Sequence, residues 1–138
     1  MLVSPTVSVR CHAQVPMGRR IAEHFILVIE NDAVIALDVA YALQSVGTRV
    51  VTSDSVELAF ELVECDVWSA VVLGPTLNEI DSSLLCEQLQ ERGIPFLLYT
   101  GTRYTKGACA KAPRVHMPSG PAALVQAVED LVHRSLLH

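Results

Sequence analysis

The residues best suited to chemistry in this chain form one short acidic segment, Glu30-Asn31-Asp32. It follows the apolar run Phe25–Ile29 and precedes a stretch of helical periodicity, so it connects a predicted strand to a predicted helix. Glu30 and Asp32 offer carboxylate oxygens to a divalent cation, and Asp32 or Asn31 can also cap the helix. Because a helix N-terminus favours acids through its own dipole, we expect capping and predict no metal site.

A second position where chemistry is expected follows the run Val67–Leu73, which has the continuous apolar character of a strand buried on both faces. In an open α/β sheet, ligands bind just beyond the carboxyl ends of the strands. The residues at that point are Gly74-Pro75, whose side chains carry neither a nucleophile nor a ligand atom. Glu79 and Asp81 lie further along the chain, and we predict Asp81 to be the N-cap of the next helix.

Two further polar residues stand at the ends of predicted strands. Thr100 follows Pro95–Tyr99, and its hydroxyl is expected to bond the exposed backbone there. His116 closes the short strand Arg114–His116; a histidine can carry a phosphoryl group, but a single histidine is more often a packing or surface residue. The chain has no glycine-rich phosphate-binding motif, and its acidic segment would repel an anionic cofactor, so we expect no cofactor.

Strand and helix patterns alternate five times and set the positions of these residues. The strands are expected at 25–29, 49–52, 67–73, 95–99 and 114–116, and the helices within 33–46, 55–63, 81–92, 102–113 and 121–137, the fourth of them short or irregular. Right-handed crossovers return such a chain to one sheet. We therefore predict an α/β fold, a doubly wound five-stranded parallel sheet in a three-layer α/β/α sandwich of flavodoxin-like type. Residues 1–23 are expected to be an N-terminal extension of the domain formed by residues 24–138, and Met17 is a second plausible start.

Composition excludes several classes of function. The 138 residues are 51% hydrophobic, yet no apolar run reaches the ~18–20 residues of a membrane span. The net charge is −5 and the longest basic block is Arg19-Arg20, so we expect no nucleic-acid partner. The cysteines form no C-x-x-C motif and are expected to be free, as small buried hydrophobes at Cys65 and Cys86, rather than metal ligands or disulfides. With no secretory signal pattern, a reducing cytoplasmic location is expected.

The order and spacing of these segments resemble the CheY-like receiver domains of bacterial response regulators, over about Phe25–Val132. The residues that carry the resemblance are Ile26–Asp32, Ile35–Asp38, Gly93–Gly101 and Met117-Pro118. The resemblance implies a small phosphotransfer domain. In such a domain two acids after the first strand hold Mg²⁺, an Asp after the third strand accepts the phosphoryl group, and a hydroxyl and a Lys contact that group.

Several of the residues that the resemblance implies are replaced in this chain. Glu30 matches the first acid and Thr100 the hydroxyl, whereas Asn31 takes the place of the second acid, Gly74 of the phosphoacceptor, Met117 of the Lys and Arg114 of an aromatic residue in the fifth strand. Glycine has no nucleophile, so aspartyl phosphorylation at position 74 is excluded. The chain therefore resembles a degenerate pseudo-receiver whose pocket serves packing, and we expect it not to be an enzyme.

The function expected from this resemblance is a stand-alone signalling module of two-component (phosphorelay) type that binds a protein partner in trans without phosphorylation. One alternative is a receiver regulated through an unorthodox phosphorylation or small-ligand site. Another is a small enzyme or cofactor-binding domain, which the acidic segment disfavours.

The last helix supplies the predicted interaction surface. Leu124, Val128 and Leu131 form its inward stripe, and a second apolar row follows at Val125, Val132 and Leu136. An exposed apolar row indicates a protein contact, so we predict a homodimer or tight heteromer centred on that row. The alternative is that the N-terminal extension covers it.

Overall fold

The structure, a computed structural model, describes residues 24–100, 107–116 and 120–136. In this part of the chain five parallel strands form one sheet in the order β2-β1-β3-β4-β5. The strands are β1 (Phe25–Ile29), β2 (Arg49–Ser53), β3 (Ala70–Leu73), β4 (Phe96–Tyr99) and β5 (Arg114–Val115). The helices are α2 (Ala33–Gln44), α3 (Val56–Cys65), α4 (Glu79–Glu91), α5 (Gly107–Ala110) and α6 (Pro121–Leu136). The predicted doubly wound α/β fold is confirmed. The predicted N-terminal extension lies outside the described residues.

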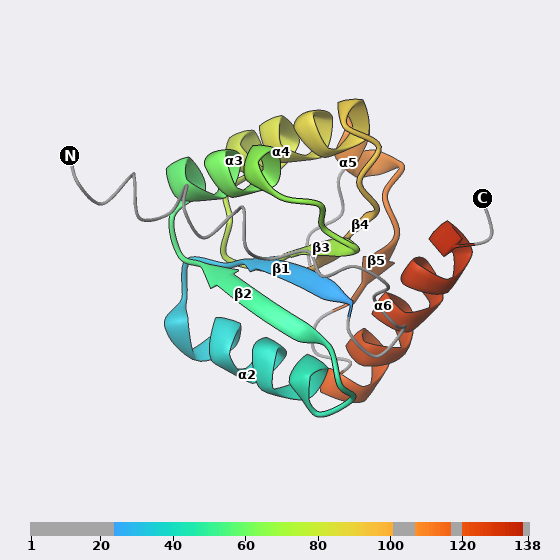
Figure 1. Cartoon of the computed structure of the whole chain (residues 1–138). Helices are drawn as coiled ribbons and strands as arrows, with labels where there is room; N and C mark the ends of the chain where they lie inside the picture. The colour runs from blue at the N-terminus through green and yellow to red at the C-terminus, as the bar shows by residue number, and fades with distance from the viewer. Residues whose placement is uncertain (1–23, 101–106, 117–119, 137–138) are drawn as a thin grey trace.

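The sheet is covered on both faces, which explains why its three central strands, β1, β3 and β4, are continuously apolar. Helices α2 and α6 lie on one face, and α3, α4 and α5 lie on the other (Figure 1). Alternate residues of β1 enter the two cores: Leu27 packs with the α3–α5 side, and Val28 with the α2–α6 side. Each residue of β1, β3 and β4 therefore contributes to one of two apolar layers, and the carboxyl ends of the strands remain as the edge where polar residues gather.

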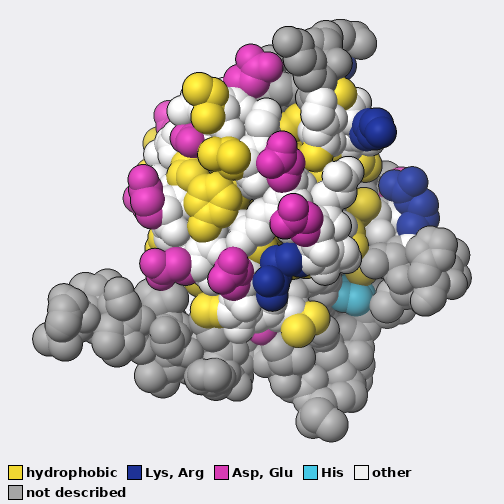
Figure 2. All heavy atoms as spheres, turned by 90° about the horizontal axis from the view of Figure 1, so that it is seen from above, with side chains coloured by type: hydrophobic (Ala, Val, Ile, Leu, Met, Phe, Trp, Pro, Cys, Tyr) yellow, Lys and Arg dark blue, Asp and Glu magenta, His cyan; other side chains and the backbone are white. Residues whose placement is uncertain are grey.

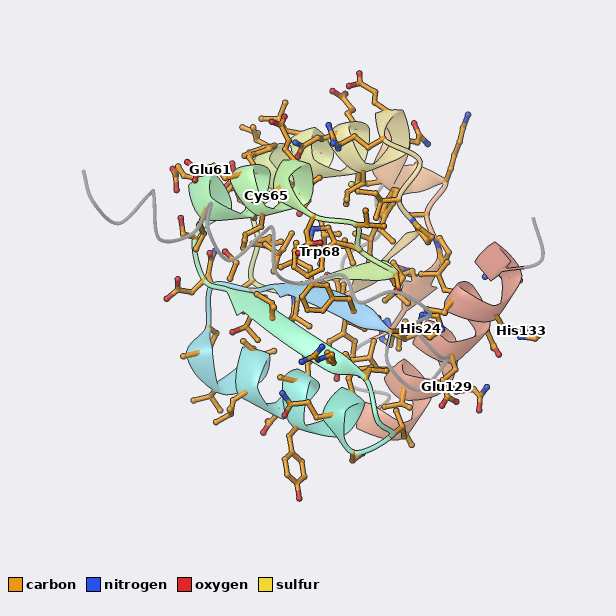
Figure 3. All side chains as sticks on the ribbon, viewed as in Figure 1. His24, Glu61, Cys65, Trp68, Glu129 and His133 are labelled. Carbon is orange, nitrogen blue, oxygen red and sulfur yellow. The ribbon has the colours of Figure 1, made fainter. Side chains whose placement is uncertain are left out.

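Trp68 covers the end of the sheet opposite to the polar residues, where the amino ends of β1 and β3 lie. The residue was expected inside the central strand, but β3 begins two residues later, at Ala70. The indole is buried, stacks on Phe25 with 4.7 Å between ring centroids, and donates from Nε1 to the Leu62 carbonyl at 2.7 Å. Trp68 lies between the sheet and α3 (Figure 3). Its burial holds α3 against the amino ends of β1 and β3.

One predicted helix cap is confirmed and one is wrong. Asp32 caps α2, its Oδ1 accepting from the Val34 and Ile35 amides at 2.9 and 3.3 Å. The cap of α4 is Asn78, not Asp81, because the helix starts at Glu79 and Asn78 Oδ1 accepts from the Asp81 amide at 2.8 Å. The Asp81 carboxylate instead lies in the first turn and accepts from Asn78 Nδ2 at 2.9 Å.

The last helix differs from the prediction at Val132. Leu124 and Val128 are buried as expected, but Val132 is also buried, at 6% exposed, and belongs to the core on the α2–α6 side. Val125 and Leu131 are half-buried against the same core, and the Leu136 side chain lies outside the described residues. The outer positions of α6 are polar: Glu129 and His133 point away from the protein (Figure 3). The predicted exposed row is therefore wrong, because Val132 continues the inward stripe one turn beyond Val128.

One cysteine, Cys65, departs from expectation, whereas Cys86 is free and buried as predicted. Cys86 and Cys109 are buried and free, whereas Cys65 is disulfide-bonded. Cys65 is half-buried in the last turn of α3, off the face that carries the core residues Ala59 and Val63. It thus lies outside the core, so the expectation of a free core cysteine is wrong and Cys65 gives no support to a reducing location. Within the described residues no helix is long and apolar enough to span a membrane.

Candidate functional site

The candidate site lies where β1 and β3 end side by side. The two strands pair in parallel with Ile29 opposite Leu73, and the Gly74 amide donates to the Ile29 carbonyl at 2.8 Å. The next residues along the two strands, Glu30 and Gly74, are consequently neighbours. The resemblance to receiver domains implied this juxtaposition, because it assigns Glu30 and Gly74 to the same pocket at the carboxyl ends of the strands.

Glu30 is the central residue of the site. Its side chain is 1% exposed, yet both carboxylate oxygens have donors from the chain itself. Oε1 accepts from the Thr76 amide at 3.1 Å, and Oε2 accepts from the Asp32 amide at 2.8 Å and from the Thr76 hydroxyl. A buried carboxylate is tolerated when such charge-assisted hydrogen bonds replace water. Glu30 thus ties the loop after β3 to the loop after β1.

Gly74 leaves the space that this carboxylate occupies. A Cβ added at Gly74 would overlap Glu30 Oε1 and would lie 2.8 Å from the Glu30 Cβ and 2.9 Å from its Cδ. Among the described glycines the left-handed backbone conformation occurs at 47, 93, 107 and 120, not at 74. Space, rather than backbone conformation, therefore requires glycine here. The Glu30 carboxylate fills the volume that a side chain at position 74 would enter.

Thr76 is the site residue that sequence reasoning missed. It lies two residues beyond Gly74 and binds Glu30 through both its amide and its hydroxyl. The available signal was a hydroxyl residue in the loop opposite the acidic segment. A hydroxyl in a loop has many possible partners, so this signal becomes specific only when the Glu30 side chain is placed.

The other two residues of the acidic segment do not face the site. Asn31 is exposed, and the Asp32 carboxylate is engaged at the N-terminus of α2. Only the backbone amide of Asp32 reaches Glu30. Among residues 24–100, 107–116 and 120–136, no group of three His, Cys, Asp or Glu side chains could hold a metal ion. The Glu30 and Asp32 carboxylates therefore have separate structural roles: Glu30 binds the loop after β3, and Asp32 caps α2.

The remaining predicted site residues lie along the same edge of the sheet or outside the described residues. Thr100 is buried at the end of β4, where its amide donates to the Val115 carbonyl at 3.1 Å. His116, directly after β5, is exposed, and Arg114 is half-buried. Met117, which takes the place of the Lys, lies outside the described residues.

No protein-family model and no curated protein matches the sequence. Solved structures do match. A CheY-like receiver domain protein from Methanospirillum hungatei JF-1 aligns with a TM-score of 0.74 and 16% identity, covering 83% of this chain and 98% of that one. The fold is that of CheY-like receiver domains.

Two further receiver structures agree with this assignment of the fold. The BeF3-activated receiver domain of DrrB, a Thermotoga maritima protein, aligns with a TM-score of 0.68 and 25% identity over 81% of this chain and 99% of that one. The receiver domain of the sensor histidine kinase PA1611 from Pseudomonas aeruginosa PAO1 aligns with a TM-score of 0.69 and 18% identity over 80% and 98%. That receiver domain holds a magnesium ion in its active-site cleft.

Proposed function

We propose that this chain is a receiver-fold signalling module of two-component type that works without aspartyl phosphorylation and acts through contacts with other proteins. The observation that carries the first part is the Glu30 carboxylate lying over Gly74. Position 74, at the carboxyl end of β3, has no nucleophile, and the space in front of it is filled by a negatively charged group.

The hydrogen bonds of Glu30 support the same proposal. A cation-assisted phosphoryl transfer needs carboxylate oxygens free to hold Mg²⁺, which offsets the charge of the phosphoryl group. Here the Thr76 amide, the Thr76 hydroxyl and the Asp32 amide already bind the Glu30 oxygens. A metal would have to break these bonds within a buried site. The pocket therefore suits a structural role, and we propose that the chain is not an enzyme.

The test of phosphorylation independence is incubation with acetyl phosphate and Mg²⁺ followed by intact-mass measurement. We expect no mass change, because position 74 has no acceptor, while the DrrB receiver treated in parallel serves as the positive control. An adduct of one phosphoryl group contradicts the proposal. A His116→Ala variant would then show whether the exposed His116 carries it, as expected for an unorthodox phosphorylation site.

The surface that supports protein contact is the outer face of α2. Val34, Leu37 and Tyr41 are 69%, 69% and 75% exposed, and their spacing of three and four residues puts them on one helix face. We call these three side chains the α2 ridge. A hollow of about 510 Å³ lies beside this α2 ridge, between α2 and α6, lined in part by Tyr41, Ala42 and Leu124. An apolar ridge next to an apolar hollow is a protein-contact surface of the kind that monomers rarely leave uncovered.

Charge favours a second copy of the chain as the occupant of the α2 ridge. The net charge is −5, and α2 carries a single charged residue, Asp38. The face over α3 and α4 is different, since acidic side chains are spread across it (Figure 2). Two like-charged copies therefore repel less through α2 than through the face over α3 and α4, and the ridge of one copy can enter the hollow of the other, whose lining includes Asp38, in an isologous dimer. We propose this homodimer in place of the one predicted through the last helix.

Leu37→Glu tests the dimer by light scattering of the full chain. We expect the wild type to be dimeric and Leu37→Glu to be a folded monomer, because Leu37 is exposed in the single protomer and does not contribute to its core. Ile80→Glu is the matched control: Ile80 is 73% exposed on α4, so the same change there should leave the dimer intact. A monomeric wild type, or equal effects of the two variants, contradicts this interface.

A further inference from the structure

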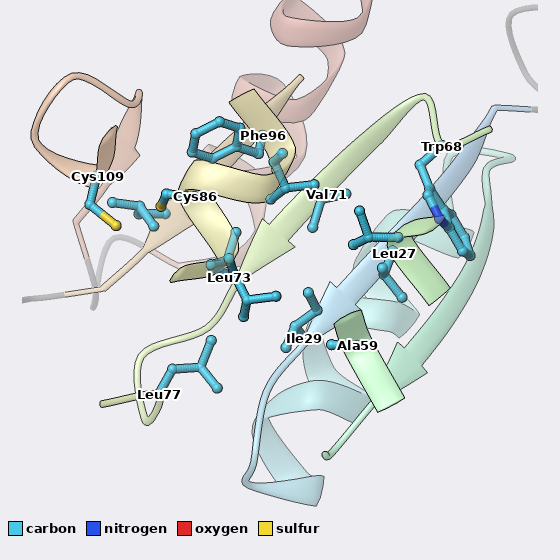
Figure 4. Packing of buried hydrophobic residues seen from close by; sticks show 14 of the residues in the cluster. Leu27, Ile29, Ala59, Trp68, Val71, Leu73, Leu77, Cys86, Phe96 and Cys109 are labelled. Atoms are coloured by element: carbon cyan, nitrogen blue, oxygen red, sulfur yellow. The ribbon is translucent and has the colours of Figure 1, made fainter. Parts of the chain in front are cut away.

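Two thiols meet inside the domain although their helices are separate in the sequence. Cys86 belongs to α4 and Cys109 to α5, and both side chains are buried and free. Their sulfur atoms point toward one another in the core (Figure 4), and the two thiols share a hydrogen bond. Cys109 Sγ also donates to the Ser82 carbonyl at 3.3 Å. The pair takes no part in the site at Glu30, and the proposed function does not use it.

The surroundings make the two thiols unequal. The hydrogen bond from Cys86, helped by Ser83, lowers the pKa of Cys109 against the opposing effects of burial and of the Glu79 and Glu87 carboxylates. The same hydrogen bond, together with burial, raises the pKa of Cys86. Cys109 is thus the sulfur that ionises first, and Cys86 keeps its proton beside it. Such an asymmetric pair provides an attacking thiolate and a second thiol positioned to resolve the product.

We propose that Cys86 and Cys109 form a reversible redox site, which a peroxide converts into a disulfide joining α4 to α5. The Cys109 thiolate attacks one peroxide oxygen, the O–O bond breaks, and hydroxide leaves and takes up a proton to give water. Cys86 then attacks the sulfenic sulfur of Cys109, the S–O bond breaks, and a second water leaves. Two thiols and one hydrogen peroxide give one disulfide and two water molecules. A small dithiol reverses the step by thiol–disulfide exchange.

Access to the buried pair comes through α5. This helix has only four residues and begins at Gly107, whose φ is 73°. One turn of helix has little stability of its own, so it can open locally while the sheet stays folded. Opening α5 brings Cys109 to solvent, whereas Cys86 remains on the thirteen-residue helix α4. Disulfide formation would then link α5, which lies between β4 and β5 in the chain, covalently to α4. This site is independent of the proposed function.

Peptide mapping of the full chain tests the proposal. The folded protein is treated with a small molar excess of hydrogen peroxide, its remaining thiols are blocked in denaturant, and it is digested with trypsin and a glutamate-specific protease without reduction. This digestion separates Cys86, in residues 80–87, from Cys65 and releases Cys109 in residues 107–111. We expect these two peptides to be joined in most of the oxidised protein and to separate after dithiothreitol. A folded wild type that keeps both thiols unoxidised, or that links either cysteine elsewhere, overturns the proposal.

Two variants assign the roles of the sulfurs. With Cys86→Ser we expect Cys109 to stop at the sulfenic acid, which dimedone captures, and with Cys109→Ser we expect Cys86 to stay unmodified. The reverse pattern overturns the assignment of Cys109 as the attacking thiol. If either variant fails to fold, the pH dependence in the wild type replaces it, because the lowered pKa of Cys109 predicts that the linking rate levels off at a lower pH than oxidation of free cysteine. A linking rate that rises throughout the titration range of free cysteine also overturns the assignment of Cys109 as the attacking thiol.

Discussion

Gly74→Ala is expected to lower the free energy of unfolding by about 2–4 kcal/mol, which combines the cost of overpacking with the loss of a hydrogen bond to a charged group. The new methyl would overlap Glu30 Oε1 and lie 2.8 Å from the Glu30 Cβ. Rotation of the carboxylate relieves the overlap with Oε1 but breaks the bonds of Glu30 with Thr76 and Asp32. The contact with the Glu30 Cβ is relieved only by a shift of the backbone. Denaturant unfolding followed by circular dichroism measures the loss.

A second substitution separates this steric cause from a general need for glycine. Glu30→Gly removes all three atoms that the added Cβ would meet, so in that background Gly74→Ala should cost less than about 1 kcal/mol. The backbone entropy of the extra glycine is common to both arms of the double-mutant cycle and cancels. An unchanged cost in the Glu30→Gly background would show that the Glu30 side chain is not what excludes a side chain at position 74.

The same geometry changes what is needed to restore a phosphoacceptor. Charge considerations alone suggest that an aspartate at position 74 should be accompanied by Asn31→Asp and Met117→Lys. The overlap with Glu30 adds a steric requirement that charge does not capture, since the Glu30 carboxylate must first leave the space over position 74. A phosphorylatable variant of this chain therefore requires a different Glu30 side-chain position as well as new charges.

Val132→Glu is expected to reduce stability by about 3 kcal/mol or more, because it places an unpaired carboxylate in the core between α6 and the sheet. Ala123→Glu on the same helix is the matched control, since Ala123 is exposed and the change there should stay within about 0.5 kcal/mol. Thermal unfolding of the two variants beside the wild type measures the difference.

This outcome distinguishes a core position from an interface position. If Val132 were the centre of a dimer contact, glutamate there would separate the protomers and leave the folded monomer intact. We expect the opposite: the unfolding temperature falls, and the oligomeric state of the folded fraction follows the wild type. A stable Val132→Glu monomer would contradict the burial of Val132 beside Val128 and Leu124.

The sequence by itself determined the architecture and the location of the candidate site. Phe25–Ile29 and Ala70–Leu73 are continuous apolar runs because both faces of a parallel sheet are covered, and this pattern predicts such a sheet without further information. The Asp32 cap was readable because capping needs only a local hydrogen bond. The resemblance to receiver domains placed Glu30 and Gly74 in one pocket, and the pairing of β1 with β3 agrees with it.

Only the tertiary structure decided what these residues contact. Helical periodicity shows that α6 has a broad apolar face, but it does not show which residues of that face are buried. The way the helix packs on the sheet determines that Val132 is one of them. The contact between Cys86 and Cys109 depends on how α4 and α5 pack across intervening chain. The position of the Glu30 carboxylate over Gly74 depends on a side-chain rotamer and on the Thr76 hydroxyl, which comes from another loop. These features involve residues distant in sequence, whose relative positions local patterns do not encode.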